Sequence, residues 1–63
     1  MKAKYIKPGM IVEHEDRGPL KVLDVWFESN GNILLDCVVA EYENYFLEWV
    51  CHQDEDVSVL LPS

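Results

Sequence analysis

Positive charge is scarce in this chain: five lysine and arginine residues stand against twelve aspartate and glutamate residues, a formal net charge of −7. Proteins that bind nucleic acids gain affinity by placing lysine and arginine against phosphates. The charge therefore argues against direct nucleic-acid binding and favours a basic protein surface as partner. A simpler role for the same charge is to keep a small domain in solution.

Long apolar runs are also absent. None approaches the roughly 20 residues that a membrane-spanning helix needs. The first lysines are not followed by the apolar segment of a secretory signal. We therefore expect a cytoplasmic protein without a membrane partner.

Signatures of catalysis and metal binding are missing as well. There is no glycine-rich phosphate loop. The two cysteines, Cys37 and Cys51, form no C-x-x-C pair and have no obvious base beside them. A metal site drawn from His14, Cys37, Cys51 and His52 is disfavoured, because Cys51 and His52 are neighbours that a strand points to opposite faces. We expect two buried free thiols, no catalytic residue, no metal and no cofactor.

What the chain does have is β-branched, aliphatic and aromatic residues, which dominate residues 20–28, 33–40 and 45–52. Runs of about eight residues are typical of strands. Two shorter runs, at 10–14 and 57–61, predict a first and a last strand. The five strands would form a single domain over residues 1–63.

The turns decide which side chains share a face. Three-residue loops at Asn30-Gly31-Asn32 and Tyr42-Glu43-Asn44 end in Asn, which tolerates the left-handed conformation needed there. They would pair Val25 with Cys37 and Cys37 with Trp49. A two-residue turn at Asn30-Gly31 is the alternative. With three-residue loops the core side would carry Leu23, Val25, Phe27, Ile33, Leu35, Cys37, Val39, Tyr45, Leu47, Trp49 and Cys51, joined by Val57, Val59 and Leu61 of the last strand.

The opposite side of this sheet is unusual, because a solvated face normally carries polar residues. It would consist of Val22, Asp24, Trp26, Glu28, Leu34, Asp36, Val38, Ala40, Phe46, Glu48, Val50 and His52. Trp26 would lie opposite Asp36, and Val38 between Asp24 and Glu48. Apolar side chains among carboxylates suit a partner's arginine or lysine. The predicted partner-binding residues are Asp24, Trp26, Asp36, Val38, Phe46, Glu48 and Val50. The alternatives are that the N-terminal segment or a second copy of the chain covers this face.

The segment Ile6-Lys7-Pro8-Gly9-Met10-Ile11-Val12, with the order of strands after it, resembles the start of SH3-like small barrels of the KOW and Tudor-like kind. The resemblance implies an all-β, five-stranded antiparallel SH3-like small barrel; an OB-like barrel is the alternative. KOW domains bind RNA through basic surfaces, and this chain departs from them in its negative charge. A Tudor-like cage for methylated lysine or arginine would use Tyr42, Tyr45, Phe46 and Trp49, although Tyr45 and Trp49 are expected in the core.

Together these patterns predict a small acidic, non-enzymatic protein-binding module. It could act as an accessory or inhibitory protein that mimics nucleic acid on a basic protein surface. The alternatives are a homodimer or other structural homo-oligomer that buries the outer sheet face, and an RNA- or DNA-binding KOW-like barrel.

Overall fold

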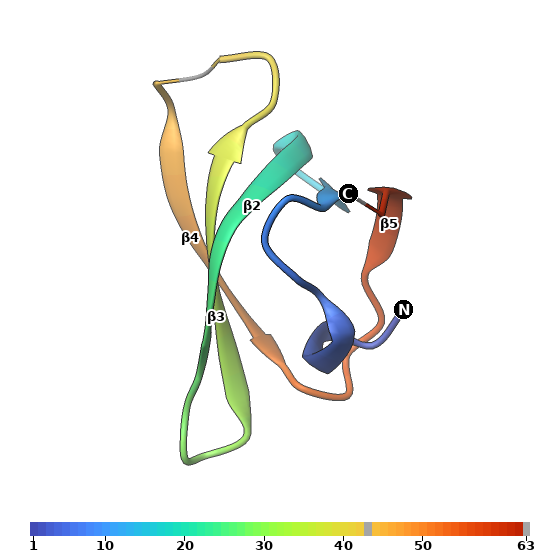
Figure 1. The fold of residues 1–63 in the computed structure, drawn as a ribbon, viewed down its shortest axis with the longest axis vertical. Helices are drawn as coiled ribbons and strands as arrows, with labels where there is room; N and C mark the ends of the chain where they lie inside the picture. The colour runs from blue at the N-terminus through green and yellow to red at the C-terminus, as the bar shows by residue number, and fades with distance from the viewer. Residues whose placement is uncertain (43, 63) are drawn as a thin grey trace.

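The computed structural model describes residues 1–42 and 44–62, which form an all-β structure with almost no helix (Figure 1). Its elements are a 3₁₀ turn η1 (Ala3–Tyr5) and the strands β1 (Ile11–His14), β2 (Gly18–Phe27), β3 (Asn32–Val39), β4 (Phe46–His52) and β5 (Ser58–Leu61). The five strands form one antiparallel sheet in the order β4-β3-β2-β1-β5. The predicted fold class is therefore confirmed at the level of five antiparallel strands.

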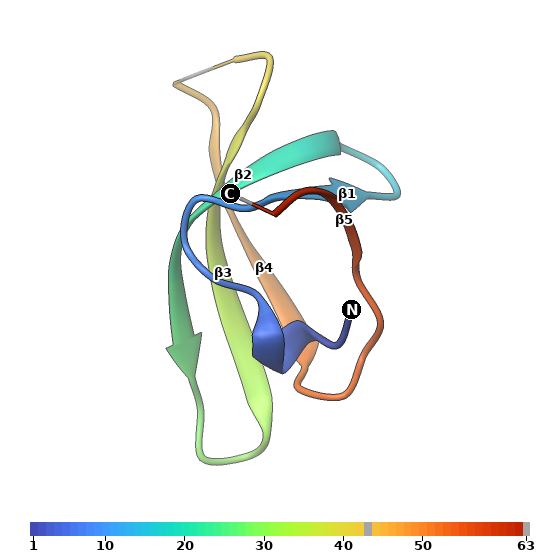
Figure 2. The ribbon, with the colours of Figure 1, turned by 45° about the vertical axis from the view of Figure 1, so that its right-hand side comes forward.

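The sheet curls but does not close, because β4 and β5 are its two edges and no pairing between them occurs in the described part of the chain. The N-terminal segment lies between these edges instead (Figures 1 and 2). The Ala3 N–H donates to the Glu55 carbonyl at 2.8 Å, and the Val57 N–H donates to the Met1 carbonyl at 2.8 Å. This pairing leaves Ala3 and Ile6 fully buried.

The core lies on the concave side of the curled sheet. β3 and β4 obey the predicted alternation: the odd-numbered residues of β3 are buried, as is Cys51, and Leu47 and Trp49 pack against the core. The core residues are Ala3, Ile6, Met10, Val12, Leu20, Val22, Ile33, Leu35, Cys37, Val39, Cys51 and Val57.

The first hairpin loop has the predicted three-residue length but begins one residue earlier, at Ser29. The Glu28 N–H donates to the Asn32 carbonyl at 2.9 Å. Gly31, with φ of 88°, takes the left-handed position that we assigned to Asn32. Glycine adopts this conformation at no steric cost. When the loop begins one residue earlier, each residue of β2 pairs with a residue two positions away from the expected one. Val25 therefore pairs with Leu35 instead of Cys37, and both side chains stay on the expected face.

The pairing of β3 with β4 is displaced in the same way. Leu35 lies opposite Trp49, and Cys37 lies opposite Leu47. The predicted pair of Cys37 with Trp49 is therefore wrong, while both side chains face the side that was expected. The predicted loop Tyr42-Glu43-Asn44 contains Glu43, which lies outside the described residues.

Two irregularities in the sheet overturn other assignments of faces. The β2–β3 register shifts between Val22 and Asp24, so Leu23 is an extra residue and the alternation of β2 reverses there. Val22, predicted outside, is fully buried, and Leu23, predicted inside, is 41% exposed. A second shift, between β1 and β5, turns Leu61 outward although it was predicted inside.

Two further residues predicted to be in the core are exposed because they lie at the ends of the sheet. Phe27 is the last residue of β2, and Tyr45 precedes β4. The core residues that cover the middle of the concave face do not extend to these ends of the sheet, so both rings contact solvent.

Candidate functional site

The outer face of β2, β3 and β4 carries three rows of side chains, each made of residues directly paired across the strands. The rows are Trp26 with Leu34 and Val50; Asp24 with Asp36 and Glu48; and Lys21 with Val38 and Phe46. Trp26 therefore lies opposite Leu34, not Asp36 as predicted. Val38 lies between Lys21 and Phe46, not between Asp24 and Glu48.

The middle row, Asp24, Asp36 and Glu48, is called here the acidic row. Directly paired residues have their Cβ atoms about 5 Å apart, and like charges in such pairs destabilise a sheet. The ion pairs found in residues 1–42 and 44–62 all lie elsewhere, between the N-terminal segment and residues 54 and 56. The acidic row is thus a line of carboxylates that makes no ion pair among these residues, although Lys21 stands in the neighbouring row of the same face and the Val25 N–H donates to Asp24 Oδ1 at 2.9 Å.

Apolar side chains border the acidic row on both sides. Trp26 is 56% exposed, Val50 54% and Phe46 62%. The N-terminal segment pairs with residues 53–57 and does not cover this face, so one alternative from the sequence is excluded. Val38 is the exception among the predicted partner-binding residues, because it is buried beside Leu23 and Phe46.

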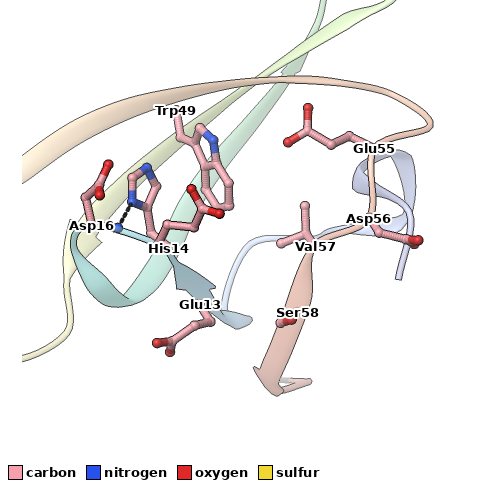
Figure 3. Close-up of a pocket in the computed structure, with 9 residues that line it drawn as sticks. Glu13, His14, Asp16, Trp49, Glu55, Asp56, Val57 and Ser58 are labelled. Atoms are coloured by element: carbon pink, nitrogen blue, oxygen red, sulfur yellow. Dashed lines mark hydrogen bonds between the residues drawn. The ribbon is translucent and has the colours of Figure 1, made fainter.

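A second feature, which the sequence reasoning did not find, is an acidic pocket on the opposite side of β4. It has a volume of about 490 Å³. Its walls come from the end of β1 and the loop after it, from Trp49 of β4, and from the segment that leads into β5 (Figure 3). The lining residues are Glu13, His14, Glu15, Asp16, Trp49, Glu55, Asp56, Val57 and Ser58.

His14 is held in place at this pocket by its neighbours. Its Nδ1 accepts the backbone N–H groups of Asp16 at 3.1 Å and Arg17 at 3.2 Å. Its ring meets the Trp49 ring edge-on, with centroids 4.7 Å apart and planes at 69° (Figure 3). His14 therefore stabilises the loop between β1 and β2 and fixes one wall of the pocket.

His52 plays a similar part in the turn after β4. Its Nδ1 accepts the Asp54 N–H at 3.2 Å, and its own N–H donates to Glu55 Oε1 at 3.4 Å. In the part of the chain that the structure describes, no three His, Cys, Asp or Glu side chains are placed to hold a metal ion.

Both cysteines are free and buried. Burial raises the pKa of the Cys37 thiol from 9.0 to about 12, with smaller contributions from the Asp36 and Cys51 charges. Burial, followed by the Glu55 charge, raises the pKa of the Cys51 thiol from 9.0 to about 11. Both sulfur atoms are therefore neutral thiols at neutral pH, a state in which cysteine is a poor nucleophile.

The rings proposed for a methyl-lysine cage do not converge. Phe46 belongs to the outer face, whereas Trp49 packs against the core and lines the acidic pocket. The Arg17 guanidinium of the chain itself lies over the Tyr45 ring, 5.8 Å from its centroid.

The comparisons with known proteins add no relative. Neither a family model, nor a curated protein, nor a solved structure matches this chain. Over the described residues, no helix has the length and apolar character required to cross a membrane.

Proposed function

We propose that the protein is a small non-enzymatic binding module that docks its outer sheet face on a basic protein surface. The observation that carries this proposal is the acidic row between exposed apolar side chains. Neither feature belongs to the buried core. A partner that supplies arginine or lysine would neutralise the carboxylates and cover Trp26 at the same time.

The chemistry of such an interface is that of a protein that normally contacts phosphates. Arginine forms bidentate hydrogen bonds with carboxylates as it does with phosphates. A line of three carboxylates on a rigid sheet would therefore compete with nucleic acid for the same basic groups. This supports an accessory or inhibitory role on a nucleic-acid-binding protein.

A structural homo-oligomer is the second candidate, because exposed Trp26, Phe46 and Val50 could equally be buried against another copy. The acidic row opposes this arrangement, since two copies placed face to face would bring their carboxylates together. We therefore rank the basic partner first.

We also propose that the domain is a variant of the SH3-like small barrel. The support is its chain path: successive antiparallel strands follow one another through β4, and β5 then returns to pair with β1. In this proposal the N-terminal segment fills the gap between β4 and β5 that a further pairing would otherwise close.

The test uses two neighbouring aromatic residues that lie on opposite faces of β2. Trp26→Ala removes the ring from the outer face, whereas Phe27→Ala removes an exposed ring from the other side. A basic protein captured from cell lysate by the wild type should bind Trp26→Ala more weakly by about 2 kcal/mol or more. Binding to Phe27→Ala should be unchanged.

Titration calorimetry of the isolated partner at low and high salt measures these affinities, and circular dichroism checks that both variants fold. Equal losses in the two variants, or none in either, would show that the outer face is not the docking surface.

A further inference from the structure

The backbone of β4 offers a second means of recognition. At one end of the β3–β4 pairing, the Val39 N–H donates to the Tyr45 carbonyl at 2.9 Å; at the other, the Gln53 N–H donates to the Gly31 carbonyl at 3.0 Å. In an antiparallel ladder the residues that bond to one neighbour alternate with those whose polar groups point away from it. The odd-numbered residues of β4 therefore bond to β3.

It follows that the N–H and C=O groups of Phe46, Glu48 and Val50 point to the free side of β4. The sheet ends at this strand. Within residues 1–42 and 44–62, these backbone groups have no hydrogen-bond partner. The free stretch stops at His52, whose backbone bonds to Glu55.

Apart from the charge of Glu48, this edge lacks the usual protection against a further strand. Natural sheets blunt their edges with proline, bulges or very short strands. β4 spans seven residues, contains no proline, and pairs with β3 without a register shift. Glu48 is the only charged side chain on its outer face before His52, and that charge admits a strand of opposite sign.

We propose that an extended basic segment of the partner adds to the free edge of β4 as a sixth strand. The inference rests on the proposed function and specifies how the partner binds. In a strand paired with β4, the residue beside Glu48 extends the acidic row by one position, so it should be lysine or arginine. The residues beside Phe46 and Val50 should be apolar.

The neighbouring position of the added strand, beside Trp49, also favours a basic side chain. Successive side chains of a strand point to opposite faces, so the residue beside Trp49 faces the inner side. Trp49 lines the acidic pocket, whose walls also carry Glu13, Glu15, Asp16, Glu55 and Asp56. A dibasic pair within an apolar, alternating segment is therefore the sequence that this edge recognises.

A second copy of the chain fits the same edge poorly. Antiparallel overlap of the free stretch Phe46–Val50 with the same stretch of a second copy places Glu48 opposite Glu48. It also joins two acidic rows into one continuous line. Like charges directly opposite each other destabilise a sheet, so charge complementarity selects a basic segment over self-pairing.

Backbone methylation of a peptide tests strand addition without changing any charge. The probe is the peptide acetyl-Thr-Val-Lys-Arg-Thr-Val-Thr-amide, whose arginine lies beside Glu48 and lysine beside Trp49 when it runs antiparallel to β4. N-methylation of the arginine removes an N–H that faces β4. N-methylation of the lysine removes one that points away, and is the matched control.

We expect the full chain to bind the unmodified and lysine-methylated peptides alike, and the arginine-methylated peptide at least tenfold more weakly. Amide NMR signals of Phe46, Glu48 and Val50 should shift on binding. Equal binding of all three peptides, binding of none, or a β4–β4 dimer that the peptide does not displace overturns strand addition. If all three peptides bind equally well and Trp26→Ala weakens their binding, the outer face remains the docking surface. Only the addition of a sixth strand is then wrong.

Discussion

Asp36 lies in the middle of the sheet between two other carboxylates, Asp24 on one side and Glu48 on the other. It is also partly buried, so solvent screens it less than it screens its neighbours. A residue in this position lowers the stability of the fold. Positions that cost stability are often those that function requires.

We therefore predict that Asp36→Asn raises the free energy of unfolding by roughly 0.2–1 kcal/mol while it weakens binding to the basic partner. The amide keeps the size of the side chain and removes the central negative charge. Urea denaturation measures the first effect and calorimetry the second.

Glu41→Gln is the control, because Glu41 is an exposed acid in a loop outside the acidic row. Glu41→Gln should change neither the free energy of unfolding nor the binding to the basic partner appreciably. A loss of stability in Asp36→Asn would mean that Asp36 makes a favourable interaction and that the row is not repulsive.

The two buried thiols make stability depend on pH in a defined direction. In the folded chain their pKa values are raised from 9.0 to about 12 for Cys37 and about 11 for Cys51. Above pH 9 the unfolded chain releases these protons and the folded chain retains them. The unfolded state then binds fewer protons, so the contribution of the thiols to stability is complete below pH 9 and is lost as the pH rises to about 11 for Cys51 and about 12 for Cys37.

We predict that the wild type loses up to about 1.4 kcal/mol per pH unit for each thiol in this range. Urea unfolding at a series of pH values from 8 to 10.5 measures the slope. The double variant Cys37→Ala with Cys51→Ala is less stable throughout because it leaves cavities, but its slope should be shallower. Identical slopes would show that the thiols ionise alike in both states.

At the scale of the strand, Leu23 decides how the residues of β2 are distributed between the two faces. Leu20 and Val22 before it face the core, and so does Val25 after it. Inward residues of a regular strand are an even number of positions apart, whereas Val22 and Val25 are three apart. Leu23 is the extra residue that accounts for this, and the register of the β2–β3 pairing shifts there.

Deleting Leu23 should therefore leave a regular strand with every inward residue still inward. We predict that this variant folds, with a loss of stability in the range of ordinary point mutations, roughly 0.5–3 kcal/mol. Deleting Leu34 from β3, which contains no bulge where it pairs with β4, should reverse the faces of half that strand and prevent folding. Circular dichroism and urea denaturation compare the two. Equal damage from both deletions would contradict the role of Leu23.

The same strand shows what the sequence could and could not predict. β3 pairs with β4 without a register shift, so alternation from the three-residue loops assigned Ile33, Leu35 and Cys37 to the core correctly, although Val38 on the other side is buried as well. β2 has a hydrophobic residue at both Val22 and Leu23, and a strict alternation accepts only one of them. The choice depends on packing against β1 and β3, which local pattern does not contain.

The candidate site divides in the same way. The outer face follows from alternation, so Trp26, Asp24 and Glu48 were placed on it correctly. The partners of Trp26 and Asp24 across the strands were not, because Gly31 and Asn32 both suit the left-handed position of the first loop, and a choice between them moves the β2–β3 pairing by two residues. The partner of Glu48 was missed because the pairing of β3 with β4 is displaced by two residues as well. The acidic pocket was missed because Glu55 reaches His14 and Trp49 only through the return of the chain to β5.

Across the described residues, the ion pairs are confined to the N-terminal segment and residues 54 and 56. Lys2 and Lys4 lie 3.8 and 3.4 Å from Asp54 Oδ1, on the side where the N-terminal segment fills the gap in the sheet. They pair with an acid there, whereas the acidic row on the outer face makes no ion pair among the described residues. The net charge of −7 belongs to the whole chain, and the acidic row and the acidic pocket carry parts of it on two sides of β4.

This distribution predicts the state of the protein in solution. Two copies meeting through their outer faces would desolvate both acidic rows and bring like charges together, which opposes the association. We predict that light scattering finds the mass of one chain at millimolar concentration in 50 mM salt.

Added salt screens the repulsion between the acidic rows, so any self-association should appear first at high ionic strength. Trp26→Ala should then reduce it and Phe27→Ala should not. A tight dimer at low salt that Trp26→Ala disrupts would instead establish the homo-oligomer and contradict a docking face kept for a basic partner.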